Sequence, residues 1–198
     1  MTWSLIRLSD TPTVPWRNGG GTTRELAAWP AGEGWAWRIS VAQVAADGPF
    51  SHYPGVQRWF AVVQGPGVRL AVDGQVREVD VASAPLAFDG AAAVESWLLA
   101  GPTQDLNLMV RRERARGAMA RLRGPQRFVT GADGVIAVYA LDAPTTLHGR
   151  GGGTCVELPP QSLAWRHLPA GTELEVATTG AICMEITPQP GGAPLRPH

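Results

Sequence analysis

The sequence predicts an all-β protein built in two halves, each a sandwich or barrel of short strands. Short runs of residues alternate between apolar and polar side chains, which is the period-2 pattern of half-buried strands. Asp-Gly pairs at 47–48, 73–74 and 133–134 are turn signals that separate these runs. Strand-like runs occur both before residue 110 and after residue 118, which indicates two β halves of comparable size.

The run WAWRISVAQV (35–44) separates apolar from polar side chains. Arg38 and Ser40 fall on one face of the expected strand. The apolar side chains assigned to the other face are Trp35, Trp37, Ile39 and Val41. If that apolar face packs in the core, Arg38 faces either solvent or a polar cavity.

Further strands are expected in both halves. VRLAVD (68–73) alternates, and DLNLMVR (105–111) places Asp105, Asn107 and Met109 opposite three aliphatic residues. In the C-terminal half the expected strands are 135–141, 172–177 and 182–187.

The segment 111–123 (RRERARGAMARLR) has two interpretations. Ala115, Met119 and Leu122 would share one face of a helix, but Gly117 interrupts it. A connection that leads into a strand is equally compatible with the pattern. Its six arginines against one glutamate indicate a solvated bridge between the halves, since no aromatic residues stand between the charges as in a nucleic-acid site.

Composition excludes several functions. The formal net charge is zero, which argues against nucleic acid as the partner, and all 17 basic residues are arginine, which excludes a Schiff-base or Walker lysine. No run of 18 apolar residues is present, and the first residues lack the pattern of a signal peptide. We therefore expect a cytoplasmic protein with no membrane partner. Cys155 and Cys183 are expected to be free, buried thiols.

The stretch PWRNGGGTTRE (15–25) contains the densest cluster of glycine and polar residues. It is neither a P-loop, because no lysine follows, nor a dinucleotide fingerprint, because Arg24 stands where the third glycine belongs. A glycine-rich turn is one interpretation. The other is the mouth of a pocket, because glycines let a backbone approach a ligand closely and expose its N–H groups.

The residue pattern gives little support to metal-dependent or nucleophilic catalysis. The four histidines form no HxH, HxxxH or HExxH pair, so no metal and no cofactor are expected. Ser51 and His52 are adjacent, and neighbouring residues on an extended chain point to opposite faces. Ser51 therefore caps a turn or offers its hydroxyl to a ligand.

The arginines point to a different chemistry. Arg24, Arg38 and Arg58 could converge with Asn18 on one pocket, where their fork-shaped guanidiniums would suit a carboxylate. Asp105 or Glu25 could hold these guanidiniums in place. Solvated surface positions are the alternative for each of these residues.

Four segments together resemble the HutD/Ves family: PWRNGGGTTREL (15–26), WAWRISVAQVAADGPFSHYPGVQR (35–58), PLAF (85–88) and GPTQDLNLMVRR (101–112). The resemblance covers roughly the first 112 residues. It implies a bicupin, in which two cupin-like β-sandwich barrels follow one another in one chain, with a metal-free small-ligand pocket in the N-terminal barrel. Gln57 and Leu106 depart from the family pattern, and Gln57 could alter the charge near Arg58.

The resemblance also implies a set of site residues. HutD-type members are associated with histidine utilisation as sensors of an intermediate such as formylglutamate or urocanate, and Ves-type members with stress. The ligand-binding residues carried over are Asn18, Gly20, Gly21, Thr23, Arg24, Glu25, Arg38, Ser40, Ser51, Arg58, Asp105, Asn107 and Met109.

Three functional hypotheses follow. The first is a non-catalytic, metal-free bicupin that binds a small acidic metabolite and regulates histidine utilisation. The second is a metal-independent enzyme on a related acid, with Glu25 or Asp105 as base. The third is a stress-induced interaction module that uses exposed tryptophans or the segment 111–123. Bicupins often form homodimers through sheet faces, but nothing in the residues decides the oligomeric state.

The expected domain organisation is an N-terminal cupin half at 1–112 with the pocket, and a C-terminal half at 113–190. The last residues, 191–198, are rich in proline and glycine and are expected to be frayed.

Overall fold

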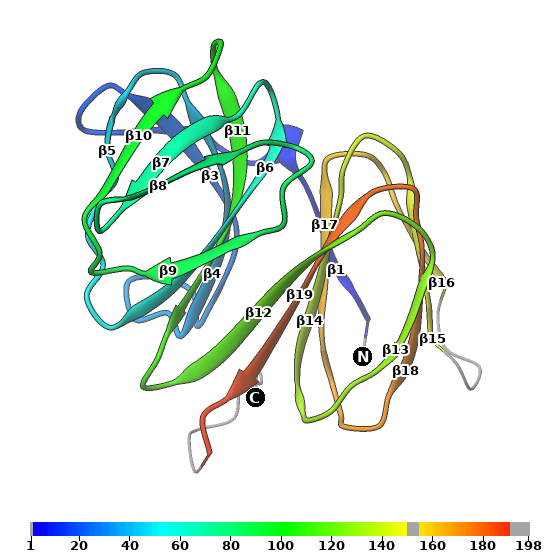
Figure 1. The fold of residues 1–198 in the computed structure, drawn as a ribbon. Helices are drawn as coiled ribbons and strands as arrows, with labels where there is room; N and C mark the ends of the chain where they lie inside the picture. Colours follow the sequence, from blue (N-terminus) through cyan, green and yellow to red (C-terminus); the bar gives the residue numbers. More distant parts are fainter. Residues whose placement is uncertain (1, 150–154, 191–198) are drawn as a thin grey trace. The chain divides into compact units, whose positions relative to one another are not determined.

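The chain forms two compact units, each built from two β-sheets. The computed structural model describes residues 2–149 and 155–190 (Figure 1). One unit is Thr11–Glu113, and the other combines Met1–Asp10 with Arg114–His198. The first ten residues therefore group with the C-terminal half, whereas the sequence-based division placed them in the N-terminal half.

The Thr11–Glu113 unit consists of a six-stranded and a four-stranded sheet. The six-stranded sheet has the order β2-β3-β4-β11-β6-β9 and the other has the order β5-β10-β7-β8, with antiparallel pairing in both. The strands are β2 Val14–Pro15, β3 Gly21–Trp29, β4 Trp37–Val44, β5 Gly48–Pro49, β6 Val56–Gln64, β7 Val68–Val72, β8 Gln75–Val79, β9 Leu86–Asp89, β10 Val94–Leu98 and β11 Thr103–Arg111.

A hydrophobic core lies between these two sheets. Phe60 and Val62 of β6 meet Val68 and Leu70 of β7, and all four are fully buried. Apolar side chains from both sheets thus close one half of the sandwich, as expected for face-to-face sheet packing. The other half of the six-stranded sheet carries polar side chains and forms the pocket described below.

The second unit repeats the two-sheet architecture. Its five-stranded sheet has the order β1-β17-β14-β19-β12 and its four-stranded sheet the order β13-β18-β15-β16. The strands are β1 Ser4–Arg7, β12 Ala115–Leu122, β13 Gln126–Val129, β14 Gly134–Ala140, β15 Thr145–Gly149, β16 Cys155–Leu158, β17 Ser162–Leu168, β18 Glu173–Ala177 and β19 Ala181–Pro188. A short 3-10 helix, η1, spans Leu8–Asp10.

The N-terminal segment completes the five-stranded sheet. β1 pairs antiparallel with β17, with Ser4 opposite Trp165 and Arg7 opposite Ser162. Leu8 is buried, and its backbone N–H donates to the carbonyl oxygen of Gln161 at 3.0 Å. These contacts explain why the first ten residues belong with the C-terminal half.

The segment 111–123 contains a strand, so the helical interpretation is wrong and the alternative of a connection leading into a strand holds. β12 pairs antiparallel with β19 along its whole length, from Ala115 opposite Pro188 to Leu122 opposite Ala181. The exposed Arg116 donates through Nε to Oε1 of Gln189 at 3.1 Å.

Three remaining expectations can be compared with the described residues. Cys155 and Cys183 are free thiols, but Cys155, the first residue of β16, is exposed, and Cys183 of β19 is only partly buried. The expected frayed segment 191–198 lies outside the described residues. Over residues 2–149 and 155–190, no helix has the length and apolarity needed to cross a membrane.

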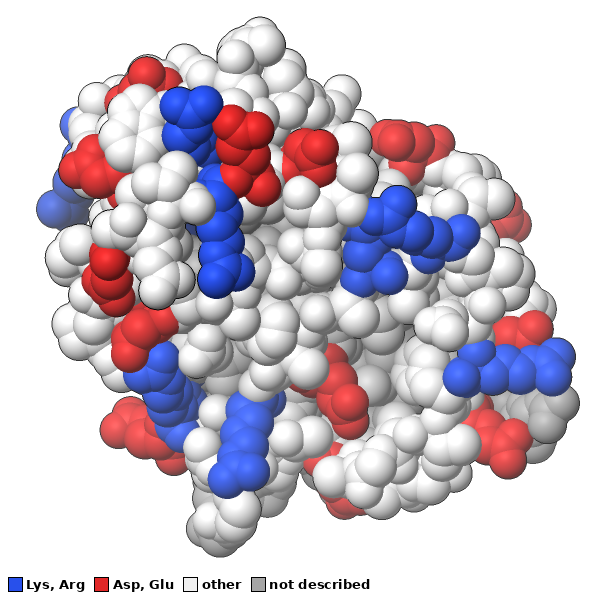
Figure 2. All heavy atoms as spheres, viewed as in Figure 1, with Lys and Arg blue, Asp and Glu red and all other residues white. Residues whose placement is uncertain are grey.

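Charged side chains of both signs alternate on the face of the molecule shown in Figure 2. Ion pairs among the described residues include Arg69 with Glu78 at 2.9 Å and Arg127 with Glu175 at 3.0 Å. Exposed pairs of this kind contribute at most about 1 kcal/mol each to stability.

Candidate functional site

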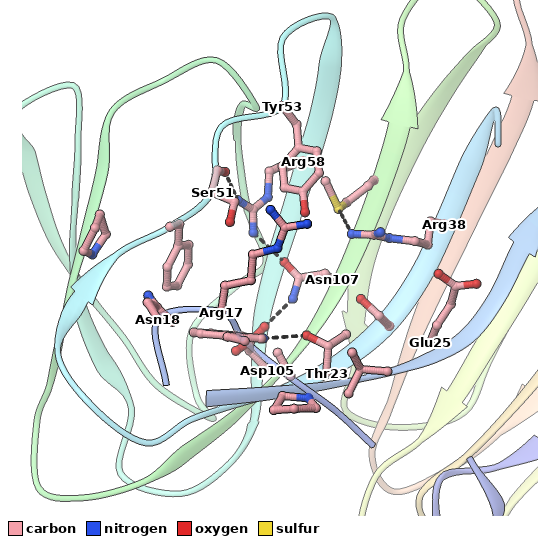
Figure 3. Close-up of a pocket in the computed structure, with 18 residues that line it drawn as sticks. Arg17, Asn18, Thr23, Glu25, Arg38, Ser51, Tyr53, Arg58, Asp105 and Asn107 are labelled. Carbon is pink, nitrogen blue, oxygen red and sulfur yellow. Dashed lines mark hydrogen bonds between the residues drawn. The ribbon is translucent and has the colours of Figure 1, made fainter. Parts of the chain in front are cut away.

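A pocket of about 710 Å³ opens on the polar part of the six-stranded sheet in the Thr11–Glu113 unit (Figure 3). Its walls combine cationic, carboxylate, hydroxyl, amide and aromatic side chains. The lining residues are Val14, Pro15, Trp16, Arg17, Asn18, Thr23, Glu25, Arg38, Ser40, Ala42, Pro49, Phe50, Ser51, Tyr53, Arg58, Asp105, Asn107 and Met109.

Alternation along β4 and β11 selects which side chains reach the pocket. Arg38 and Ser40 of β4, with Asp105 and Asn107 of β11, face it, while the intervening aliphatic side chains point to the opposite face and are buried. The central Met109 pairs with Arg38 on one side and with Arg58 on the other, so these three form a row across the sheet. Of the two alternatives left open for Arg38, the cavity is the one observed.

Trp35 does not share a face with Trp37, contrary to the sequence-based assignment. It precedes the first residue of β4, so the strand alternation does not apply to it. Its ring packs with Val56 and Met109, next to the pocket.

The glycine-rich stretch forms the turn between β2 and β3. The backbone N–H of Trp16 donates to Gly21 at 2.9 Å, and that of Gly20 donates to the side-chain oxygen of Asn18 at 3.1 Å. The indole of Trp16 donates to Oγ1 of Thr23 at 2.7 Å, which fixes the ring at the pocket wall. The turn itself is held by backbone and Asx-type hydrogen bonds.

Not every residue of this stretch lines the pocket. Asn18, Thr23 and Glu25 do so, whereas Gly20 and Gly21 are absent from its wall. Arg24 alternates with Thr23 and Glu25 along β3, and its Nε donates to Thr13 at 2.9 Å outside the pocket.

Gly21 serves the strand pairing that supports this wall. A Cβ at this position would lie 2.2 Å from the carbonyl oxygen of Gln43 and 3.1 Å from the ring of Trp16. Glycine is therefore required because two backbones and an indole meet there.

Arg58 is the most deeply buried cation of the pocket. Its guanidinium lies over the rings of Phe50, Tyr53 and Phe88, at 5.3, 5.8 and 5.1 Å from their centroids. It donates to the side-chain oxygen of Asn107 at 3.2 Å and to the Ser51 carbonyl at 3.4 Å. Burial lowers its pKa from the usual value.

Arg38 is held by an aromatic and thioether cage. Its guanidinium lies 5.3 Å from the ring centroid of Trp35 and 5.6 Å from that of Tyr53. One terminal nitrogen is 3.0 Å from the sulfur of Met109, and the buried Nε has no hydrogen-bond partner among the described residues. The cage orients the guanidinium and leaves its charge unneutralised.

Asp105 ends a buried polar chain. Its Oδ2 accepts a hydrogen bond from Asn107, whose other amide atom accepts from Arg58. Its Oδ1 is buried and has no partner among the described residues. Desolvation raises the pKa of Asp105 to about 7, although the charge of Arg58 and the bond from Asn107 act in the opposite direction.

The pocket has an excess of unpaired positive charge. Arg17, Arg38 and Arg58 line it against Glu25 and Asp105, and Figure 3 shows Arg17 reaching across it. Within the described part of the chain, the three guanidiniums form no ion pair with a carboxylate, whereas Arg112 outside the pocket bonds Asp89 at 2.7 Å. Such an arrangement can receive an anion.

The ligand-binding residues predicted from the sequence and the residues that line the pocket overlap in part. Ten of the predicted residues line the pocket: Asn18, Thr23, Glu25, Arg38, Ser40, Ser51, Arg58, Asp105, Asn107 and Met109. Trp16, Arg17 and Tyr53 line it as well and were not in the predicted set. Trp16 and Arg17 stand inside the quoted stretch 15–25, so their nearness to Asn18 was the available signal.

Metal ligands are not gathered in the described residues. Within 2–149 and 155–190, no group of three or more His, Cys, Asp or Glu side chains lies close enough to hold a metal ion.

Comparisons with known proteins identify related chains. A family model described as HutD matches residues 8–184. An uncharacterized 21.2 kDa protein in the hutC 3′ region of Pseudomonas putida is 38% identical over 139 residues, which are 69% of this chain and 73% of that protein. Protein Ves of Cronobacter sakazakii is 34% identical over 156 residues, which are 78% of this chain and 81% of that protein.

Solved structures show the same fold. HutD from Pseudomonas fluorescens SBW25, in a formate condition, superposes with a TM-score of 0.81 at 31% identity and covers 96% of this chain and 100% of its own. The oxalate decarboxylase of Lactobacillus farciminis has a TM-score of 0.66 at 8% identity, over 96% of this chain and 87% of its own, which is a likeness of fold alone. The expectation of an all-β bicupin is confirmed.

Proposed function

The chain belongs to the HutD/Ves family, and from this we propose that it is a non-catalytic protein that binds a small carboxylate through the arginines of its pocket. One observation carries the proposal. Arg17, Arg38 and Arg58 line one pocket of about 710 Å³, and none of them forms an ion pair with a carboxylate among the described residues. Arg58 is buried and Arg38 is half-buried, whereas Arg17 is exposed. A buried guanidinium normally pairs with an acid, and a ligand carboxylate would supply it.

The biological role that we propose rests on the family. HutD-type members are associated with histidine utilisation, and the P. putida relative is described by its place in the hutC 3′ region. We therefore propose a cytoplasmic sensor that regulates histidine utilisation, with formylglutamate or urocanate as the signal. The formate condition of the P. fluorescens HutD structure makes formate a useful minimal probe.

Thermal unfolding against a panel of acids tests the binding function. The panel contains urocanate, formylglutamate, formiminoglutamate, glutamate, formate and histidine, each with and without EDTA. A ligand at 100 times its Kd stabilises the folded state by about 2.7 kcal/mol, which corresponds to a rise in Tm of roughly 5–10 °C for a chain of this size. We expect such a rise with at least one acid, unaffected by EDTA.

Two arginine variants make the test specific to the pocket. Arg38→Met keeps an unbranched apolar stem but removes the guanidinium and its charge, so the affinity for the ligand should fall at least tenfold. Arg24→Met removes a guanidinium from the neighbouring strand outside the pocket and should respond to ligand like wild type. A wild-type response in Arg38→Met, or no response of the wild type to any acid, would show that this pocket assignment is wrong.

A second candidate function is a metal-independent enzyme, favoured by the buried carboxylate of Asp105. A group with a pKa of about 7 in a ligand pocket is suited to accept and return a proton. Conversion of a panel acid into a product, followed by NMR and lost in Asp105→Asn while binding persists, would establish this function in place of the first.

A further inference from the structure

The carboxyl group of Asp105 has two unequal oxygens. Asn107 donates to Oδ2, and the orientation of that amide is set by Arg58, which donates to its oxygen. Oδ1 is buried without a partner among the described residues. A proton on Asp105 would therefore reside on Oδ1, where it disturbs no existing hydrogen bond.

Asp105 and a bound carboxylate would share one cation. Arg58 is the charged group that acts on Asp105, and it is also the most buried guanidinium of the pocket. The other titratable groups of the pocket wall are Arg38 on β4, Glu25 on β3, Arg17 in the β2–β3 turn and Tyr53 before β6.

Repulsion between the ligand carboxylate and Asp105, which lie near the same guanidinium, determines the protonation state of Asp105. When two carboxylates lie close together in a poorly hydrated site, their repulsion raises the pKa of one of them. A ligand acid with a solution pKa near 4 remains ionised beside the arginines, and Asp105 is the group that can neutralise itself.

Building on the proposed function, we infer that a small carboxylate binds beside Arg58 together with one proton, which is taken up by the buried Oδ1 of Asp105. The bound state then holds one more proton than the free state wherever Asp105 is ionised without ligand. Raising the pH therefore favours the ligand-free protein. The affinity for the carboxylate falls by up to tenfold per pH unit above the titration midpoint of Asp105. Below that midpoint Asp105 is already neutral and affinity is constant.

The titration of Asp105 can be observed directly. Protein labelled with ¹³C at the aspartate carboxyl carbon is titrated by NMR from pH 5 to pH 9, without formate and with formate at saturating concentration. The resonance of Asp105 is the one missing from Asp105→Asn. We expect a midpoint near 7 without formate, and a rise of about one pH unit or more with formate, which equals a tenfold change in formate affinity.

Two variants complete the test. Asp105→Asn should bind formate with an affinity that does not change between pH 6 and pH 9, because its amide cannot take up a proton. Asp89→Asn changes an aspartate outside the pocket wall and should keep the wild-type pH dependence.

Failure of this inference differs from failure of the proposed function. If formate raises Tm but the midpoint of Asp105 stays constant or falls, proton uptake is refuted and carboxylate binding stands. If neither formate nor any other panel acid raises Tm at pH 6, the binding function fails and the inference falls with it. An Asp105 resonance that does not titrate between pH 5 and pH 9 also refutes the inference.

Discussion

The side chain of Asp105 makes the stability of the fold depend on pH. In the unfolded chain an aspartate has a pKa near 4, whereas burial raises the pKa of Asp105 to about 7 in the folded protein. Between these two values the folded state binds more protons than the unfolded state. The contribution of Asp105 to the free energy of unfolding therefore decreases as pH rises from about 4 to about 7. Above pH 7 this destabilising contribution stays constant.

Asp105→Asn should remove the destabilisation that the buried Asp105 carboxylate causes at high pH. A difference of about three pKa units corresponds to roughly 4 kcal/mol, which is an upper limit for the stabilisation of Asp105→Asn at pH 8. At pH 5 most of the stabilisation by Asp105→Asn should disappear, because Asp105 is then neutral in the folded protein. Urea unfolding at the two pH values measures it. Equal effects of the substitution at pH 5 and pH 8 would contradict a raised pKa.

Strand alternation explains which site residues could be predicted one by one. Arg38, Ser40, Asp105 and Asn107 lie inside regular strands, so their common face followed from the period-2 pattern. The position of Trp35 did not follow, because it lies outside β4.

Loop residues set the limit of this prediction. Arg17 and Tyr53 come from segments without regular alternation, and the direction of their side chains depends on the turn geometry. The spacing of residues in the sequence does not predict the direction of side chains in such loops.

At the level of elements, the pairing of β3 with β4 depends on Gly21. The glycine lies opposite Val44, and its Cα faces the Gln43 carbonyl and the indole of Trp16. The neighbouring Gly20 has more room, since a Cβ there would meet only the side chain of Asn18, at 3.4 Å.

Gly21→Ala and Gly20→Ala should therefore differ strongly. The added methyl group at Gly21 forces the backbone apart and should cost about 1–3 kcal/mol or more. At Gly20 the same substitution should change stability by less than about 1 kcal/mol. Equilibrium unfolding of the two variants checks this, and a Gly21→Ala variant as stable as wild type would disprove the close approach.

The strand β12 shows why some elements could not be predicted. Ala115, Met119 and Leu122 are the residues that suggested a helical face, and all three are buried in the strand. The spacing of four places Ala115 and Met119 on one face of either structure, whereas the spacing of three places Leu122 on the opposite face of the strand, where it is buried as well. The strand is favoured by its pairing with β19, whose residues lie 59 to 73 positions further along the chain, and no local pattern contains that information.

At the level of the whole molecule, one of the two units is assembled from both ends of the described chain. The change of unit falls between Glu113 and Arg114. The transfer of Met1–Asp10 to the other unit was not predicted, because the pairing of β1 with β17 joins residues far apart in sequence.

Removal of residues 1–10 should weaken the C-terminal unit selectively. Hydrogen exchange of the β17 amides should become faster, while the pocket strands β4 and β11 keep their protection. Leu8→Ala tests the same contact without truncation and should cost about 2–5 kcal/mol, because Leu8 is 4% exposed. Leu5→Ala, at a site 41% exposed, is the matched control. Equal protection of β17 in the truncated and full chains would refute the role of β1.

The pairing of β1 with β17 also has a consequence for the time course of protein synthesis. Ser4–Arg7 leave the ribosome about 155 residues before Ser162–Leu168, the strand that they pair with. At about 5–20 residues per second, this separation lasts roughly 8–30 s. During that time β17 has not been synthesised, so the nascent β1 strand lacks its partner, and the five-stranded sheet can be completed only after β17 and β19 have been made.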